Sequence, residues 1–289
     1  MESRLSKLEV INCAMELRQQ VSRWRGNGDR VGVVPTMGAL HAGHLCLVSA
    51  AKTECQRVIA TIFVNPTQFG PTEDLAKYPR TLAVDLRLLA AEGVDAVFVP
   101  SDLEMYPSGF STFVEPPDVA QQWEGAFRPT HFRGVATVVL KLINMAQADV
   151  AFFGQKDFQQ VAVVKHLVAD LNVPCEIAVV PTVRDADGLA LSSRNRFLSP
   201  EERKKALAIP RALHEAELAI RSGQRHGYKV MNDLNQHLIQ GGVDHVEYAV
   251  AANPDDLTVM VEIRFPVVLL VAVRVGATRL IDNILIEAT

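Results

Sequence analysis

Two histidines at a strand-to-helix turn are the side chains of this sequence best suited to chemistry. His41 and His44 follow an apolar, β-branched run at residues 31–34, which predicts a buried strand. Apolar residues recur at helical spacing over residues 45–51, so a helix is expected to begin at the histidines. A helix N-terminus offers unpaired N–H groups and partial positive charge, which suit a phosphate. Two imidazoles there can donate hydrogen bonds to a triphosphate and to the charge that develops when it is cleaved.

Two other interpretations of the histidine pair stay open on spacing alone. Two polar residues at this point can simply cap the helix. His-x-x-His spacing also occurs in zinc sites, but no Glu lies within the pair and no Cys pair is adjacent, which disfavours zinc. Gly43, between the histidines, lets a phosphate or a purine approach the backbone closely.

A second turn of the same kind follows the strand expected at residues 150–153. It comprises Gly154, Gln155, Lys156 and Asp157 and leads into a helix expected at residues 158–172. Lys156 at a helix N-terminus is well placed as a point charge for phosphate. Asp157 could cap the helix, hold a ribose hydroxyl or neutralise Lys156, and the cap is compatible with either other role.

Two amide side chains are candidates for binding a small substrate. Gln68 lies in a turn-rich polar loop directly after the strand expected at residues 58–64. Ligands of parallel sheets lie beyond the carboxyl ends of the strands, so we expect Gln68 over the same crevice as the histidines. A solvated loop amide is the alternative. Gln160 belongs to a polar pair that opens an otherwise apolar helix, which packing alone does not explain.

Two further polar clusters carry weaker signals. Arg128, His131 and Arg133 lie in a loop before the helix expected at residues 135–147, where they could touch anionic groups or be ordinary loop charges. Ser192, Ser193 and Arg194 offer two hydroxyls and a guanidinium that could close over the β- and γ-phosphates. A solvated turn is the alternative for this triplet. The phosphate-binding interpretation is favoured because the triplet follows the other two turns in the chain.

The elements that position these residues alternate between strand and helix as far as Pro181, which predicts an α/β fold with a parallel sheet. A helix is expected to begin at the capping-box residues Ser6 and Glu9. Beyond Pro181 we expect helices at residues 200–222 and 228–240, and three strands near 245–251, 267–273 and 279–286, an α+β arrangement. The predicted domain boundary is near Arg184, which gives domains 1–184 and 185–289.

Composition excludes several classes of protein. The chain has 289 residues, 48% hydrophobic and 21% charged, with a net charge of −4 and no basic block. Neither non-specific nucleic-acid binding nor membrane-surface binding is favoured, and the longest apolar run is too short to span a bilayer. Its four cysteines form no CxxC pair, and the N-terminus lacks a signal-peptide core. We therefore expect reduced thiols and a cytoplasmic protein.

Six segments, taken together, resemble one family over nearly the whole chain. They are PTMGALHAGH, IFVNPTQFGPTEDLAKYPRT, HFRGVATVVLKLINM, AFFGQKDFQQ, DGLALSSRN and TRLIDN, in the family's order and spacing. The family is pantothenate synthetase, also called pantoate–β-alanine ligase, a branch of the HxGH nucleotidyltransferase superfamily. The resemblance implies a Rossmann-like N-terminal domain and a smaller C-terminal lid domain. It also implies a homodimer, Mg²⁺, and ligation of pantoate to β-alanine through pantoyl adenylate, with release of pyrophosphate and AMP from ATP.

The resemblance also assigns residues. The ATP site is expected to comprise Met37, Gly38, Ala39, Leu40, His41, Ala42, Gly43, His44, Gly154, Gln155, Lys156, Asp157, Val183, Leu191, Ser192, Ser193 and Arg194. Pantoate is expected at Gln68 and Gln160, and the catalytic assignments are His41, His44, Lys156 and Arg194. Protein ligands for Mg²⁺ are not identified. Two positions depart from the family pattern: Gln155 replaces a Glu and removes a negative charge beside Lys156, and Thr130 replaces a loop glycine.

Two rival functions fit parts of the pattern. A nucleotidyltransferase that moves AMP or CMP onto a phosphate acceptor would need a basic pocket, whereas the loops around Gln68 and Gln160 offer amides. A non-catalytic nucleotide-binding module would not need the full set of His, Lys and Arg. Adenylation explains the set best, because positioning and charge stabilisation are most of what the protein must supply.

Overall fold

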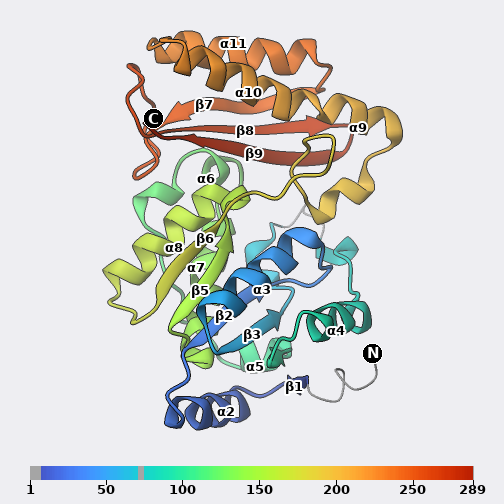
Figure 1. The fold of residues 1–289 in the computed structure, drawn as a ribbon, viewed down its shortest axis with the longest axis vertical. Coiled ribbons are helices and arrows are strands. Elements are labelled where there is room, and N and C mark those ends of the chain that lie inside the picture. Colours follow the sequence, from blue (N-terminus) through green and yellow to red (C-terminus); the bar gives the residue numbers. More distant parts are fainter. Residues whose placement is uncertain (1–7, 71–74, 289) are drawn as a thin grey trace. The chain divides into compact units, whose positions relative to one another are not determined.

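The computed structural model describes residues 8–70 and 75–288, and this part of the chain forms two compact units (Figure 1). The first unit runs to Gly154 and also contains Val163–Val180, and the second contains Gln155–Ala162 and the chain from Pro181 onward. Compact packing does not by itself make a unit an independent domain. The boundary near Arg184 therefore stays a prediction.

The first unit is built on a six-stranded sheet in the order β1-β4-β3-β2-β5-β6, in which every pair of neighbours is parallel. The strands are β1 (Glu9–Ile11), β2 (Val31–Thr36), β3 (Arg57–Ile62), β4 (Ala96–Phe98), β5 (Val150–Gly154) and β6 (Glu176–Val180). Parallel neighbours need crossover connections, and helices supply most of them. The predicted α/β fold with a parallel sheet is confirmed.

The helices around this sheet are of two kinds. The longer ones are α2 (Ala14–Gly26), α3 (Ala42–Glu54), α4 (Leu82–Ala91), α7 (His131–Ala146) and α8 (Phe158–Asp170). The first turns of α8 belong to the second unit. The shorter ones are α5 (Asp102–Met105), α6 (Glu124–Phe127) and the 3₁₀-helices η1 (Pro66–Gln68), η2 (Leu75–Lys77) and η3 (Asp118–Ala120). No helix among the residues described is long and apolar enough to cross a membrane.

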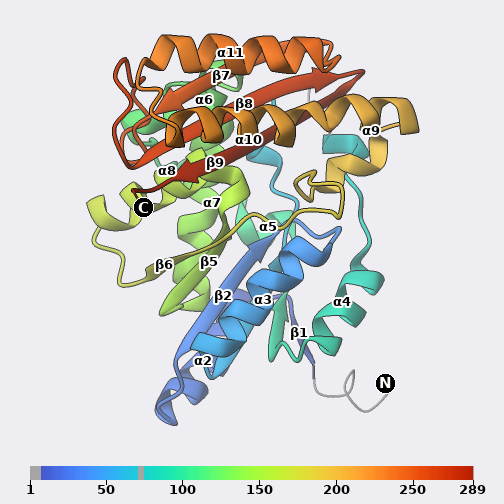
Figure 2. The same cartoon turned by 45° about the horizontal axis from the view of Figure 1, so that its top comes forward.

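One apolar layer joins α3 to the sheet. Val34 of β2 and Phe152 of β5 share a buried cluster with Leu47 and Val48 of α3, and Figure 2 shows α3 lying along β2. Side chains alternate between the faces of a strand, so Val33 is directed to the opposite face. β2 lies between β3 and β5, and the strand order reverses there, which is the topological switch point where open α/β sheets bind ligands.

The second unit contains a three-stranded antiparallel sheet, β7-β8-β9, with helices on one face (Figure 1). Its elements are β7 (His245–Ala252), β8 (Val267–Val275), β9 (Thr278–Ile286), α9 (Pro200–Ala206), α10 (Ala208–Arg221), α11 (Gly227–Gln240) and the 3₁₀-helices η4 (Gln155–Asp157) and η5 (Ser193–Phe197). Leu213 of α10, Leu234 of α11 and Leu269 of β8 are central to its buried core. The α+β expectation for this part of the chain is met.

Three local predictions are wrong. The helix expected at residues 135–147 begins at His131, so His131 and Arg133 lie in its first turn and not in a loop before it. Residues 9–11 form β1, paired with β4, and α2 begins only at Ala14, because hydrogen bonds to a neighbouring strand outweigh a local capping pattern. Ser6 lies outside the described residues. The single helix predicted for residues 200–222 is two helices that meet at Leu207. Pro210 has no N–H to continue the first helix but fits the first turn of the second.

Candidate active site

The turn between β2 and α3 is held by one buried carboxylate. Asp85 of α4 is 1% exposed, and its two oxygens accept hydrogen bonds from the N–H groups of Ala39 at 3.0 Å and Leu40 at 2.9 Å. The hydroxyl of Thr81 donates to the same carboxylate at 3.0 Å. Gly38 has φ +79°, and a Cβ there would lie 3.1 Å from Asp85 Oδ2. The close approach of the carboxylate and the left-handed backbone both favour glycine at this position.

The two predicted histidines lie together at the start of α3. The Nδ1 of His41 accepts the N–H of Gly43 at 3.2 Å, and the Nδ1 of His44 accepts the N–H of His41 at 3.3 Å. The ring centroids are 4.1 Å apart. An Nδ1 that accepts a hydrogen bond carries no proton, so the neutral ring carries its proton on Nε2. The pair therefore caps the helix and keeps an Nε2–H donor on each ring, so the capping and phosphate-binding interpretations are compatible.

Gln68 is in the same unit as the histidines and contacts the loop that leads to them. Its side-chain amide donates to the Sδ of Met37 at 3.0 Å, and the residue is 8% exposed. Asn65, which is 1% exposed, donates to Gln68 Oε1 at 3.2 Å and accepts from the hydroxyl of Tyr106 at 2.7 Å. Gln68 is thus a held amide rather than a solvated loop residue.

The start of α7 and the residue Arg128 before it contact Gln68 from its backbone side. The Nδ1 of His131 lies 2.9 Å from the carbonyl oxygen of Gln68, and Arg128 donates to the same oxygen at 3.3 Å. A Cβ on Gly134 would lie 2.4 Å from the Thr67 carbonyl oxygen, so this glycine permits close packing of α7 on the loop. The sequence left open whether Arg128 and His131 touch anionic groups or are ordinary loop charges. In the structure they instead hold the backbone of the loop that contains Gln68.

Arg133 in the first turn of α7 and Thr130 at its N-cap have local explanations. Arg133 lies over the ring of Phe113, with its guanidinium carbon 4.0 Å from the ring centroid. Thr130, which replaces the glycine of the family pattern, has φ −97° and ψ −8°. Any L-residue adopts that conformation, so the threonine imposes no backbone strain here.

The second unit contains the turn with Lys156. The ammonium group of Lys156 lies 3.3 Å from a carboxylate oxygen of Asp157. The side-chain amide of Asn283 on β9 donates to the carbonyl oxygens of Gln155 at 3.0 Å and Lys156 at 2.8 Å. Gln155 in turn donates to Asn283 Oδ1 at 3.4 Å. Of the roles open to Asp157, the contact with Lys156 is observed.

The segment that leads to Ser192 is anchored in the same unit. Arg184 makes a bidentate contact with Asp282 of β9, at 2.6 and 3.0 Å, and its side chain also donates to the carbonyl of Gly188 at 3.1 Å. The N–H of Leu191 donates to the carbonyl of Val183 at 2.9 Å, which brings these two predicted residues together.

Ser192 and Arg194 then form a capped turn. The hydroxyl of Ser192 accepts the N–H of Arg194 at 3.3 Å at the start of η5, which also includes Ser193. All three residues are partly exposed.

The predicted site residues therefore fall into two groups. The first unit holds Met37 to His44, Gln68 and Gly154, and the second holds Gln155, Lys156, Asp157, Gln160, Val183 and Leu191 to Arg194. Sequence reasoning missed Asn65, Asp85 and Asn283. Asn65 begins the polar loop that contains Gln68, and Asn283 ends the TRLIDN segment, so position offered a weak signal for both. For Asp85 the sequence offers no signal, because its backbone partners lie 46 and 45 positions earlier in the chain.

The two buried thiols are poor nucleophiles, and the carboxylates of Asp85 and Asp157 already have partners within the protein. Burial raises the pKa of Cys175 to about 12 and also raises the pKa of Cys55, so both thiols are neutral near pH 7 and unreactive as nucleophiles. Within residues 8–70 and 75–288, no three His, Cys, Asp or Glu side chains are grouped to hold a metal ion. The carboxylate of Asp85 is occupied by backbone and hydroxyl donors, and that of Asp157 faces Lys156.

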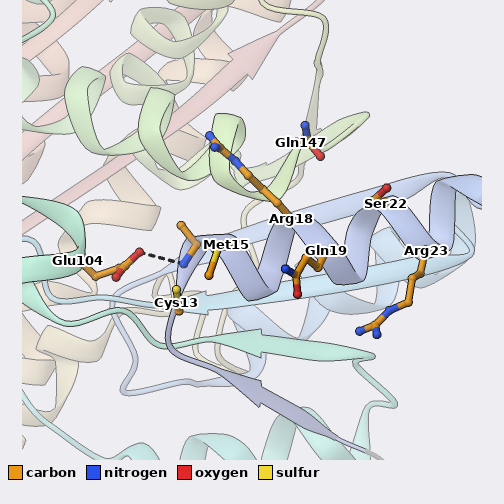
Figure 3. A pocket seen from close by; sticks show the side chains of 9 residues that line it. Cys13, Met15, Arg18, Gln19, Ser22, Arg23, Glu104 and Gln147 are labelled. Carbon is orange, nitrogen blue, oxygen red and sulfur yellow. Dashed lines mark hydrogen bonds between the residues drawn. The ribbon is translucent and has the colours of Figure 1, made fainter.

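An open groove elsewhere on the first unit contains none of these residues. It has a volume of about 870 Å³ and lies along α2 (Figure 3). Its lining comprises Cys13, Ala14, Met15, Arg18, Gln19, Ser22, Arg23, Glu104 and Gln147. Glu104 accepts the N–H of Ala14 at 2.9 Å and so completes the start of the helix. The groove is a helix flank with mixed charge and has no converging catalytic groups.

Comparison with known proteins gives one consistent result. A family model described as pantoate-beta-alanine ligase matches residues 9–285. Pantothenate synthetase 1 of Bradyrhizobium diazoefficiens is 51% identical over 281 residues, covering 97% of this chain and 99% of that protein. A crystal structure of pantothenate synthetase from Thermus thermophilus matches with TM-score 0.90 and 43% identity, covering 96% and 98% of the two chains. A pantoate-beta-alanine ligase from Francisella tularensis, complexed with beta-gamma ATP and beta-alanine, matches with TM-score 0.77 and 34% identity over 96% of this chain and 97% of that one.

Proposed function

The chain belongs to the pantoate-beta-alanine ligase family, and we propose how its own residues carry out that reaction. The enzyme condenses pantoate with β-alanine to form pantothenate, with ATP as co-substrate and pantoyl adenylate as the intermediate. The observation that carries this conclusion is the match over nearly the full length of both chains.

The reaction proceeds in two displacements. In the first, a carboxylate oxygen of pantoate attacks the α-phosphorus of ATP, and the bond to the bridging oxygen breaks, so that pyrophosphate leaves with the electron pair. In the second, the amine of β-alanine attacks the acyl carbon of pantoyl adenylate, and AMP leaves as the amine loses a proton. A free carboxylate is a poor acylating agent, so the adenylate supplies the leaving group. The protein's task is mainly to orient the reactants and to stabilise charge.

We propose that His41 and His44 are catalytic and donate from Nε2 to the phosphate oxygens on which charge develops. The support is the hydrogen-bonding of both Nδ1 atoms to backbone N–H groups, at 3.2 and 3.3 Å, which assigns the tautomer. It also fixes each ring against rotation, so the donors are oriented before ATP binds. Preorganised donors of this kind cost no reorganisation at the moment of reaction.

Lys156 and Arg194 are the proposed cationic contacts to the leaving pyrophosphate, with Ser192 and Ser193 as hydroxyl donors. The side chain of Lys156 is 19% exposed and paired with Asp157, so it is partly desolvated before any ligand arrives. The backbone of the Met37–Gly43 loop, together with Gly154, Gln155, Val183 and Leu191, completes the proposed ATP site. Asp157 is the proposed ribose contact.

Gln68 and Gln160 are the proposed contacts to pantoate. An amide can pair with hydroxyls and a carboxylate without neutralising the nucleophile, which a lysine or arginine would do. The support for Gln68 is its fixed position, since its side chain contacts Met37 and Asn65 and its backbone carbonyl contacts His131 and Arg128. Gln160, in the first turns of α8, is half-buried.

Mg²⁺ is the proposed metal and would supply charge neutralisation on the phosphates. The donor set fits an ion held mainly by phosphate oxygens and water, because Mg²⁺ keeps several waters and needs few protein carboxylates. Among the described residues no cluster of acidic side chains competes with that arrangement.

The proposed assembly is a homodimer, located in the cytoplasm and without nucleic acid. A lid role for residues 185–289 is part of the same proposal.

Pyrophosphate–ATP exchange across a panel of carboxylic acids tests the proposal. We expect exchange only when pantoate is present, because the first displacement is reversible and needs its carboxylate. Exchange in the absence of any carboxylic acid would contradict a carboxylate-adenylating enzyme. Exchange with a phosphorylated acceptor instead would favour the rival transferase, which the amide side chains at Gln68 and Gln160 do not support.

A further inference from the structure

Asn283 makes contacts that neither strand pairing nor core packing requires. It lies in β9 opposite Leu270 of β8 and is 2% exposed. Its side-chain amide group donates two hydrogen bonds, to the carbonyl oxygens of Gln155 at 3.0 Å and Lys156 at 2.8 Å. These residues precede Asn283 by 128 and 127 positions in the chain.

Both hydrogens of the amide group are therefore used on two successive carbonyl groups. A buried amide is costly unless it is paired, so this position would favour an apolar residue if packing were its only role. Two bonds to neighbouring carbonyls fix the planes of the peptide groups on either side of the Lys156 Cα. Fixing those planes sets the direction in which the lysine side chain leaves the backbone.

Gln155 completes the arrangement. Its side-chain amide donates to Asn283 Oδ1 at 3.4 Å, so the Asn283 side chain is satisfied on both its donor and acceptor atoms. An ionised glutamate at position 155 would have no hydrogen to donate to that oxygen, so the glutamine matches Asn283 as a donor.

The neighbouring residue on β9 acts on the other proposed phosphate-binding segment. Asp282 holds Arg184 through two oxygens at 2.6 and 3.0 Å, and Arg184 also donates to the Asn283 carbonyl at 3.3 Å. Adjacent residues of one strand therefore hold the turn with Lys156 and the segment that leads to Ser192. A rigid strand locates side chains more precisely than a loop does.

We infer that Asn283 is a positioning residue for adenylation, which orients Lys156 toward the phosphates by holding the carbonyl groups of Gln155 and Lys156. This inference rests on the proposed phosphate contact of Lys156. It goes beyond that proposal because it assigns a role in the first half-reaction to a buried residue of the C-terminal sheet that touches no substrate. A merely structural Asn283 would instead stabilise the fold without favouring either half-reaction.

The test is a double-mutant cycle of Asn283→Ala and Lys156→Ala, measured in the two half-reactions separately. Adenylate formation is followed in a single turnover with ATP and pantoate, and the second step by adding β-alanine to preformed enzyme-bound pantoyl adenylate. We expect Asn283→Ala to slow adenylate formation about 10- to 100-fold, the range that small misplacements of a reacting group cause. The second step should keep its rate. In the Lys156→Ala background, Asn283→Ala should cause no further loss, because residues that act through one another are not additive.

Two further variants separate positioning from folding. Asn283→Asp keeps the volume but places a carboxylate oxygen against two carbonyl oxygens, so it should slow adenylation at least as much as Asn283→Ala. Thr278→Val changes another buried polar residue of β9 and should leave both half-reactions unchanged. Thermal melting of each variant reports the folded fraction to which rates are referred. If Asn283→Ala does not fold, the same cycle is measured with Asn283→Asp.

The outcomes are distinct. Equal slowing of both half-reactions, or the same loss with and without Lys156, would overturn the positioning role and leave the phosphate role of Lys156 intact. Normal adenylation by Lys156→Ala would remove the phosphate role itself and the inference with it. Loss confined to the first half-reaction and absent from the Lys156→Ala background would support both.

Discussion

The turn after β2 and the turn after β5 are alike locally but are held in place in different ways. Each follows a parallel strand and precedes a helix, and each has a glycine close by: Gly38 lies within the first turn and Gly154 ends the strand before the second. In the first, His41 and His44 hold each other and the helix start through contacts within four residues of chain. In the second, the carbonyl oxygen of Lys156 accepts a hydrogen bond from Asn283, which lies 127 positions away.

This difference separates two ways of orienting a proposed phosphate-binding group. The contacts of the histidines form whenever the strand-turn-helix unit forms, and only the turn before them also requires a distant residue, Asp85. The contact of Asn283 forms only when the C-terminal sheet is in place, so the proposed orientation of Lys156 requires that sheet. Four variants test this contrast, in decreasing order of the effect that we expect.

His44→Ala should have the largest effect on activity. It removes a donor to the developing charge, which costs on the order of 10²–10³ in rate. His44→Asn is the matched variant, because its side-chain oxygen can still accept the N–H of His41 while no Nε2–H remains. We expect both variants to lose pyrophosphate–ATP exchange and His44→Asn to be the more stable. Near-normal exchange by a folded His44→Ala protein would remove His44 from the mechanism.

Asp85→Ala should have the largest effect on stability. The buried N–H groups of Ala39 and Leu40 would lose their acceptor, at about 1–3 kcal/mol for each unpaired donor. Urea unfolding measures the loss. Thr81→Val removes only one donor to the same carboxylate and should cost less than Asp85→Ala. An unchanged unfolding midpoint in Asp85→Ala would show that the first turn is held by its local contacts alone.

Arg194→Ala should reduce adenylation by about 1.5–3 kcal/mol, the usual worth of a hydrogen bond to a charged group. The proposed role also predicts slower hydrogen exchange in residues 187–196 when ATP and pantoate bind, and weaker protection in the variant. Exchange that is the same with and without ligands, together with normal turnover of Arg194→Ala, would make this segment a bystander. The interpretation that its serines and arginine close over the phosphates would then be wrong.

Gly134→Ala should have the smallest effect and should act on pantoate rather than on ATP. The added methyl would lie 2.4 Å from the Thr67 carbonyl oxygen and 2.7 Å from the Gln68 Cα, so the loop that contains Gln68 must shift. Overpacking of this kind costs about 1–3 kcal/mol. We expect a higher KM for pantoate with an unchanged KM for ATP. Gly26→Ala, where no atom lies within 4 Å of the new methyl, is the control. Equal changes in both KM values would contradict a specific effect on Gln68.

Sequence reasoning reached the features that depend on neighbours in the chain. The individual strands, the turn with His41 and His44 and the turn with Lys156 each follow from short sequence patterns. Hydrophobic periodicity and turn residues indicate such units, and the parallel sheet follows from the alternation of strands and helices along the chain. The same reasoning failed at residues 9–11, where pairing with β4 overrides a capping pattern.

Which residues hold the site in place is determined by the fold and could not be predicted from the sequence. Asp85 reaches Leu40 across 45 positions, His131 reaches Gln68 across 63, and Asn283 reaches Lys156 across 127. A carboxylate, an imidazole or an amide has no fixed role in a sequence, because its partner is whichever donor or acceptor the fold buries beside it. The sequence alone therefore shows which chemistry the chain contains, and the packing of distant segments selects the polar residues that orient that chemistry.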